Sequence, residues 1–236
     1  MIRRTFRWGS LLLILFLLAN LTLAVVTNVP THIDSFDAAV FNTLLNVKKP
    51  IRANSYEEEL VLVREVQKRI FLAAPLGEPI PEYRDREPVD LINHGTGVCY
   101  DRSRTFDKIF AWLGFETRHV YILYLKHPRT QEPLSFWRAF FTYGAGSHAV
   151  TEVKTSHGWM LVDSNNPWIS LNKSGEPVGA DDLWRNPQQF DEMPAYFKQP
   201  YSAIRGMYSR RGQFYRPYIP YPELNWADFF EWLLWG

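Results

Sequence analysis

The chain has 236 residues, of which 46% are hydrophobic and 22% charged, a composition typical of a folded globular protein rather than a disordered one. Its length fits one domain with appendages. The formal net charge is only +1, and three arginines of the N-terminal segment contribute to it, so the remainder is nearly neutral. This charge balance argues against nucleic acid as a partner.

The N-terminal residues predict a membrane anchor. Residues 11–26 are uncharged and mostly apolar, and their neighbours extend the uncharged stretch over 8–27, about the 20 residues that cross a bilayer as a helix. The arginines within residues 1–7 favour a cytoplasmic N-terminus, which places the body outside the cytoplasm, in the periplasm or at the cell surface. A cleaved signal peptide is the alternative, since Thr22 and Ala24 supply small residues for a cleavage site.

Two helices are expected next. Asp34 or Ser35 can cap the first, so residues 28–54 are predicted to form a juxtamembrane helix and a linker. The second has a clearer start, because Ser55 and Glu58 have the spacing of a capping box, in which each side chain bonds the other residue's backbone N–H. Apolar residues then recur at helical spacing, which predicts a helix packed on the core.

The only cysteine of the chain, Cys99, lies in the most informative stretch. Gly95 and Gly97 allow a tight backbone just before it, and apolar residues recur at helical spacing from Phe106 to Leu113. A thiol in the first turn of such a helix lies near unpaired N–H groups, which favour the thiolate. We therefore interpret Cys99 as a nucleophile. The alternative is a small buried apolar side chain.

An irregular loop and three strands are predicted around this helix. Residues 73–90 hold four prolines and should form a surface loop that leads to the cysteine. Residues 115–125 are rich in β-branched and aromatic side chains and predict a strand. Residues 147–154 and 159–164 are two strand-like runs joined by a short turn, which indicates a hairpin.

The hairpin brings an imidazole and a carboxylate together. If its turn has two or four residues, His148 and Asp163 fall on the same face, directly opposite or one diagonal step apart. A slip of one residue would move Asp163 to the other face. With Cys99, these residues supply a nucleophile, a base and a group that orients the base.

Three blocks of the sequence resemble the transglutaminase-like superfamily, relatives of the papain-like cysteine proteases. The blocks are Gly97-Val-Cys99 with the helix that follows, Leu113 to Val120 with its Leu-Gly and Arg-X-Val positions, and Ser147-His-Ala through Asp163-Ser-Asn. The resemblance covers about residues 55–168. It departs at Val150, where the family usually has tryptophan.

The resemblance implies an α+β, papain-like fold in which the cysteine helix packs on an antiparallel sheet, with Cys99, His148 and Asp163 as catalytic residues. The implied reaction is acyl transfer at an amide bond through a Cys99 thioester. Water would release the product in a protease, amidase or deamidase, and an amine in a transglutaminase. The substrate would be an extracytoplasmic protein or peptide-containing molecule. The alternative is a catalytically silent interaction module in envelope or polysaccharide assembly.

Further residues are candidates for contact with substrate. The backbone N–H of Cys99 is one candidate oxyanion donor, and the second is expected from the segment before it, for example from Tyr83 or His94. Tyr100, next to the thiol, is predicted to bind substrate together with these two residues. We predict no cofactor and no metal site, because a single cysteine and scattered histidines lack ligand spacing. His119, in a predicted strand, is expected to be a satisfied core residue.

Residues 169–236 are predicted to be an aromatic-rich extension. Between Glu192 and Glu223 basic residues alternate with aromatic ones and no acid occurs. We interpret this stretch as a solvated extension that wraps the core. The alternative is a surface that binds a protein, glycan or lipid-headgroup partner. Asn225 can cap a final, very apolar helix, too short to span a membrane, that docks on the body, on a partner or at a bilayer surface.

Overall fold

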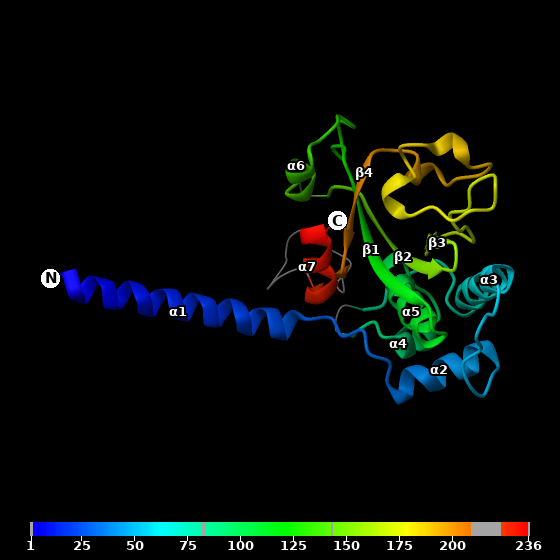
Figure 1. Ribbon diagram of the computed structural model, residues 1–236, viewed down its shortest axis with the longest axis horizontal. Coiled ribbons are helices and arrows are strands. Elements are labelled where there is room, and N and C mark those ends of the chain that lie inside the picture. The colour runs from blue at the N-terminus through cyan, green and yellow to red at the C-terminus, as the bar shows by residue number, and fades with distance from the viewer. Residues whose placement is uncertain (1, 82–83, 143, 209–222, 236) are drawn as a thin grey trace.

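The computed structural model describes residues 2–81, 84–142, 144–208 and 223–235. The helices are α1 (Ile2–Thr27), α2 (Ser35–Leu45), α3 (Tyr56–Ala73), α4 (Pro88–His94), α5 (Cys99–Trp112), α6 (Phe136–Phe140) and α7 (Trp226–Trp235). The strands are β1 (Glu116–Tyr124), β2 (Ser147–Thr155), β3 (Gly158–Val162), β4 (Tyr201–Arg205), β5 (Met207–Tyr208) and β6 (Glu223–Leu224). In Figure 1, α5 lies against the sheet, and α2, α3 and α4 surround α5.

A four-stranded antiparallel sheet, in the order β3-β2-β1-β4, forms the centre of the fold. Strands β2 and β3 form the predicted hairpin, with Thr151 opposite Val162 and Thr155 opposite Gly158 around a turn of two residues. Helix α5 packs on β2 and β1, as Figure 1 shows. The predicted α+β class, with helices packed on an antiparallel sheet, is confirmed.

Helix α5 is buried on nearly all sides. The predicted apolar face is confirmed, since Phe106, Ile109 and Phe110 are fully buried in the main core cluster with side chains of α3. The polar residues of α5 are buried as well, among them Arg104 and Lys108. A periodic apolar stripe predicts a solvated opposite face, so this second buried face is a finding of the structure.

The start of α3 differs from the predicted capping box in one bond. The Ser55 hydroxyl accepts from the backbone N–H of Glu58 at 3.3 Å, as expected. The Glu58 carboxylate instead accepts from the backbone N–H of Asn54 at 2.8 Å, one residue earlier than predicted. Both donors are satisfied, so the helix begins where the sequence indicates.

The C-terminal extension contributes to the body of the protein. Residues 201–205 form the edge strand β4, which pairs with β1 from Val120 opposite Arg205 to Tyr124 opposite Tyr201. Side chains of the extension, such as Phe197, pack in one cluster with those of the sheet. The aromatic residues of the extension lack periodicity because they fill this cluster from irregular segments.

Two distant parts of the chain meet at the end of α1. The backbone N–H of Val29 donates to the Leu224 carbonyl at 2.8 Å, and the Asn225 amide donates to the Val29 carbonyl at 3.0 Å. The Asn225 side chain also caps α7, as predicted, by accepting from the backbone N–H of Asp228 at 3.1 Å. Helix α7 therefore starts beside the residues that follow α1.

Helix α1 covers the predicted anchor and extends away from the body in Figure 1. Among the described residues, no helix is both long enough and apolar enough to cross a membrane. The predicted anchor over residues 8–27 is therefore not confirmed. Most of the predicted basic and aromatic stretch falls on residues 209–222, outside the described residues.

Candidate active site

Cys99 is the first residue of α5, where the helix start is fixed by a buried carboxylate. Asp101 accepts from the backbone N–H groups of Val98 at 3.0 Å and Ile80 at 3.2 Å, and it forms an ion pair with Arg86 at 3.1 Å. These bonds join the loop before the cysteine to the first turn of α5. The N–H of Cys99 lies in that first turn, where no intrahelical acceptor exists.

The Cys99 thiol is half-buried and polarised by its neighbours. Burial opposes ionisation, but a hydrogen bond to His148 and the charge of that imidazole favour it, as do bonds from the backbone N–H groups of Ala149 and Tyr100. The favourable contacts outweigh burial and hold the pKa of the Cys99 thiol below its ordinary value.

His148, on β2, joins the thiol to Asp163. Its Nε2 lies 2.7 Å from Asp163 Oδ1, and both side chains are buried. Because an ionised carboxylate only accepts, Nε2 donates and Nδ1 is the nitrogen left for Cys99. Burial alone would lower the pKa of His148, but the bonds to Asp163 and Cys99 raise it to about 9. The two opposite shifts are those of a thiolate–imidazolium pair.

The relative position of His148 and Asp163 follows from the hairpin register. Thr151 faces Val162, so His148 and Asp163 lie on one face and one diagonal step apart, with Asp163 just beyond the paired part of β3. The prediction that the side chains of His148 and Asp163 lie in contact is confirmed.

Asp163 accepts several further hydrogen bonds. The Tyr196 hydroxyl and the Asn166 amide, the latter at 3.0 Å, both donate to Oδ2, and the backbone N–H of Asn165 donates to Oδ1 at 3.0 Å. Burial raises the pKa of Asp163, but the bond and charge of His148 and the bond from Tyr196 lower it more, so it stays ionised. The two asparagines could have been predicted as hydrogen-bond donors to Asp163, because they follow it in the Asp-Ser-Asn-Asn run. No neighbouring residue in the sequence indicates that Tyr196 donates to it.

Side chains of α3 and α5 form hydrogen bonds to the turn that carries Asp163. The Gln67 amide, buried on α3, donates to the carbonyls of Asp163 at 2.9 Å, Asn166 at 3.1 Å and Trp168 at 3.0 Å. Arg102, one turn after Cys99, donates to Asn165 Oδ1 at 2.7 Å. The helix that carries the nucleophile therefore also positions the turn that carries the carboxylate.

Aromatic side chains from the extension cover the imidazole. The rings of Tyr196 and Phe197 lie 4.9 Å and 5.8 Å from the His148 ring. Burial raises the pKa of Tyr124 at the end of β1, and the charges of Cys99 and Asp163 raise it further, so its hydroxyl stays protonated. Sequence reasoning missed all three residues, because they come from other elements and lack a local motif.

The structure describes two of the three predicted substrate-binding residues. Tyr100 is half-buried in the first turn of α5, with the Arg86 guanidinium 4.4 Å from its ring centre. His94 is exposed at the end of α4, and within the described chain no hydrogen bond or ion pair joins it to Cys99, His148 or Asp163. Tyr83 lies outside the described residues.

Comparison with known proteins identifies the superfamily. The model of the transglutaminase-like superfamily matches residues 48–164, a range that contains α3, α5 and the β2–β3 hairpin. It also contains Cys99, His148 and Asp163. No curated protein matches the chain. Through residues 48–164, the chain belongs to the transglutaminase-like superfamily.

Proposed function

We propose that the protein is a cysteine-dependent hydrolase or acyltransferase that acts on amide bonds of a protein or peptide-containing substrate. The observation that carries this proposal is the buried contact of His148 with Asp163, 2.7 Å between Nε2 and Oδ1, next to a Cys99 thiol whose pKa is lowered. Membership of the transglutaminase-like superfamily supports the same assignment.

The proposed reaction uses each residue in turn. The Cys99 thiolate attacks the amide carbon, and the carbonyl oxygen becomes an oxyanion near the backbone N–H of Cys99. His148 gives its Nδ1 proton to the amine as the C–N bond breaks, which leaves a thioester and a neutral imidazole. The imidazole then takes a proton from water or from a second amine as that group attacks the thioester, and the thiolate leaves. Asp163 keeps the imidazole in the required tautomer throughout.

Hydroxylamine trapping tests the proposal. A thioester that forms from a peptide amide reacts with hydroxylamine to give a hydroxamate, which mass spectrometry locates in the peptide. With a peptide mixture rich in glutamine and lysine, wild-type protein should give hydroxamates and the Cys99→Ala variant should give none. Asp163→Asn should slow the reaction by about 10²- to 10⁴-fold, because the imidazole loses the partner that fixes its tautomer. Equal hydroxamate yields from wild type and Cys99→Ala would contradict the proposal.

We further propose that residues 8–27 attach the domain to a membrane, with the body in the periplasm or at the cell surface. Apolar side chains support this, since every residue from Leu11 to Leu18 is between 45% and 65% exposed on α1. An apolar surface of this extent is costly in water and favourable in lipid.

Membrane extraction tests the attachment. Wild-type protein should stay in the membrane pellet at alkaline pH, and the double variant Leu15→Arg/Leu18→Arg should be released, because each central arginine costs about 2.5–3.5 kcal/mol on insertion. Leu72→Arg, an exposed apolar residue of α3, is the control and should stay in the pellet. A soluble wild-type chain, or one cleaved near Ala24, would contradict an uncleaved anchor.

A second candidate function is that of an interaction module. Exposed aromatic side chains favour it, namely Trp137 of α6, Phe141 directly after α6 and Phe230 of α7. The rings of Phe136 and Trp232 place these two helices in contact. Such a module would keep its partner in the Cys99→Ala variant, whereas the enzyme would lose its product. The trapping experiment above therefore separates the two functions.

A further inference from the structure

Arg102 is a buried cation next to the nucleophile. It lies three positions after Cys99 on α5, and side chains with this spacing are neighbours on a helix, with about 5–6 Å between their Cβ atoms. The residue is only 1% exposed. Because a guanidinium keeps its proton in proteins, a permanent positive charge lies inside the protein beside the thiol.

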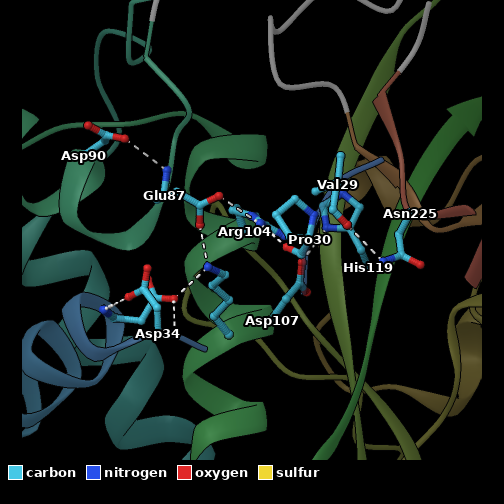
Figure 2. Close-up of polar contacts among 11 residues, drawn as sticks. Val29, Pro30, Asp34, Glu87, Asp90, Arg104, Asp107, His119 and Asn225 are labelled. Carbon is cyan, nitrogen blue, oxygen red and sulfur yellow. Dashed lines mark hydrogen bonds and ion pairs between the residues drawn. The ribbon is translucent and has the colours of Figure 1, made fainter. Parts of the chain in front are cut away.

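The described residues give Arg102 little compensation for its burial. Its Nη2 donates to the neutral acceptor Asn165 Oδ1 at 2.7 Å, and the guanidinium carbon lies 5.1 Å from the Phe71 ring centre. In the described part of the chain, its buried Nε has no hydrogen-bond partner and no acidic side chain forms an ion pair with it. By contrast, Arg104 on the same helix pairs with Glu87 at 2.9 Å, as Figure 2 shows. A buried charge without a carboxylate partner costs stability, so stability does not explain Arg102.

The negative charges that act on Arg102 belong mainly to the active site. Burial holds the pKa of the Arg102 guanidinium below its ordinary value, and the charge of Cys99, followed by that of Asp163, opposes this effect. In the ion-paired state, Cys99 and Asp163 each carry one negative charge and His148 carries one positive charge. These three side chains therefore have one negative charge in excess, which the charge of Arg102 balances.

Other ionisable groups near the site do not supply this charge. Arg86 is buried, but its charge is matched by Asp101, 3.1 Å away. His94 is exposed at the end of α4, where solvent screens its charge. Burial raises the pKa of Tyr124 and of Tyr196, and the negative charges of the site raise both further, so these two hydroxyls stay neutral. The described groups around the site thus provide no second unmatched buried cation.

We propose that Arg102 is a positioning residue whose buried charge stabilises the Cys99 thiolate and the Asp163 carboxylate, and so sets the pH range in which the thiolate exists. The bond to Asn165 fixes the guanidinium, and the backbone N–H of Asn165 in turn donates to Asp163 Oδ1 at 3.0 Å. This inference rests on the proposed function in one respect, that the thiolate is the reactive form of Cys99. The alternative is a structural role alone, in which Arg102 only holds the turn that carries Asp163.

The pH dependence of alkylation tests this role. Cys99 is the only cysteine, so mass spectrometry of the full-length protein after iodoacetamide treatment reports on this thiol alone. Arg102→Met should move the midpoint of the alkylation profile upward by at least about one pH unit, because an opposite charge this close lowers the pKa of an acid by about 1–3. Arg102→Lys keeps the charge and should move the midpoint less than half as far.

A second titration separates a charge effect from a structural one. In protein labelled with ¹³C-histidine, NMR follows the ionisation of His148, whose pKa is raised to about 9, and His148→Ala identifies its signal. Loss of a nearby positive charge makes both groups harder to deprotonate, so in Arg102→Met the midpoints of Cys99 and His148 should both rise. Loss of the contact between these two side chains would instead raise the midpoint of Cys99 and lower that of His148.

Arg104→Met is the matched control. Arg104 is similarly buried on α5, but it is paired with Glu87, and its five-residue separation from Cys99 places it on another face of the helix. This variant should leave both midpoints unchanged. Melting temperatures establish that each variant is folded. If either unfolds, Arg102→Gln replaces Arg102→Met, and Lys154→Met, which removes an exposed cation of β2, replaces Arg104→Met.

Three results would overturn this proposal. They are an unchanged Cys99 midpoint in Arg102→Met, a lower His148 midpoint in that variant, and a shift in Arg102→Lys or in the control as large as that in Arg102→Met. Alkylation and the histidine titration need no substrate, so they are independent of hydroxylamine trapping. Shifted midpoints without a trapped hydroxamate would contradict the proposed function and leave this role of Arg102 intact, whereas trapping with unchanged midpoints would do the reverse.

Discussion

Iodoacetamide at pH 6 is expected to alkylate Cys99 roughly tenfold faster in the wild-type protein than in a His148→Ala variant. A thiol with an ordinary pKa of about 8.5 is only about 0.3% thiolate at pH 6. The bond to His148 lowers the pKa of Cys99 and so raises this fraction by up to about 300-fold. The lower intrinsic nucleophilicity of a less basic thiolate cancels part of the gain.

The pH profile distinguishes the ion pair from a merely exposed thiol. Wild-type alkylation should rise through the lowered pKa of Cys99 and then stay level, whereas acyl transfer should fall again as His148 loses its proton at a pH of about 9. His157→Ala is the matched control, because His157 is an exposed histidine at the turn of the same hairpin. Identical pH profiles of alkylation for wild type and His148→Ala would contradict an ion pair between Cys99 and His148.

Replacing Lys108 by methionine is expected to destabilise the fold by about 3–5 kcal/mol, because it leaves Asp37 and Glu87 with less compensating charge in the interior. The side chains of Lys108 and Asp37 are only 5% and 3% exposed, and each contact with Lys108 Nζ measures 2.7 Å. Urea unfolding measures the loss. The double variant Asp37→Asn/Lys108→Met should recover part of it, since the buried Asp37 carboxylate that loses its cation is then removed as well.

An exposed ion pair provides the control for this prediction. Lys154 and Glu116 lie 2.8 Å apart, but their side chains are 49% and 57% exposed. Lys154→Met should therefore change the free energy of unfolding by less than about 1 kcal/mol. Equal losses for Lys108→Met and Lys154→Met would show that burial of the α5 ion pairs has no effect on stability.

The sequence predicts those parts of the fold in which neighbouring residues determine geometry. The hairpin is predictable because a strand alternates with period two and a short turn fixes its register, which is why the contact of His148 with Asp163 could be inferred. The cysteine helix is predictable from the glycines before Cys99 and the apolar spacing after it. The superfamily blocks lie in these same elements.

Parts that depend on distant contacts were missed. Strand β4 pairs with β1, about 80 positions earlier, and nothing in its own residues indicates that pairing. Tyr196 likewise contacts Asp163 from a short 3-10 helix, Ala195–Phe197, whose residues do not indicate that contact. In the sequence, the charged residues of α5 have the pattern of a solvated helix face. Their burial could not be predicted, because the partners Asp37 and Glu87 lie outside α5.

The contact between Val29 and Asn225 sets an order of events in biosynthesis. The two residues are 196 positions apart, so their hydrogen bond cannot form until all of residues 48–164 have been synthesised. The superfamily core can therefore begin to fold while Val29 still lacks these two partners. A chain that stops before Leu224 would leave the backbone N–H and carbonyl of Val29 without these bonds. The two hydrogen bonds of Val29 therefore form only after the superfamily core has been synthesised.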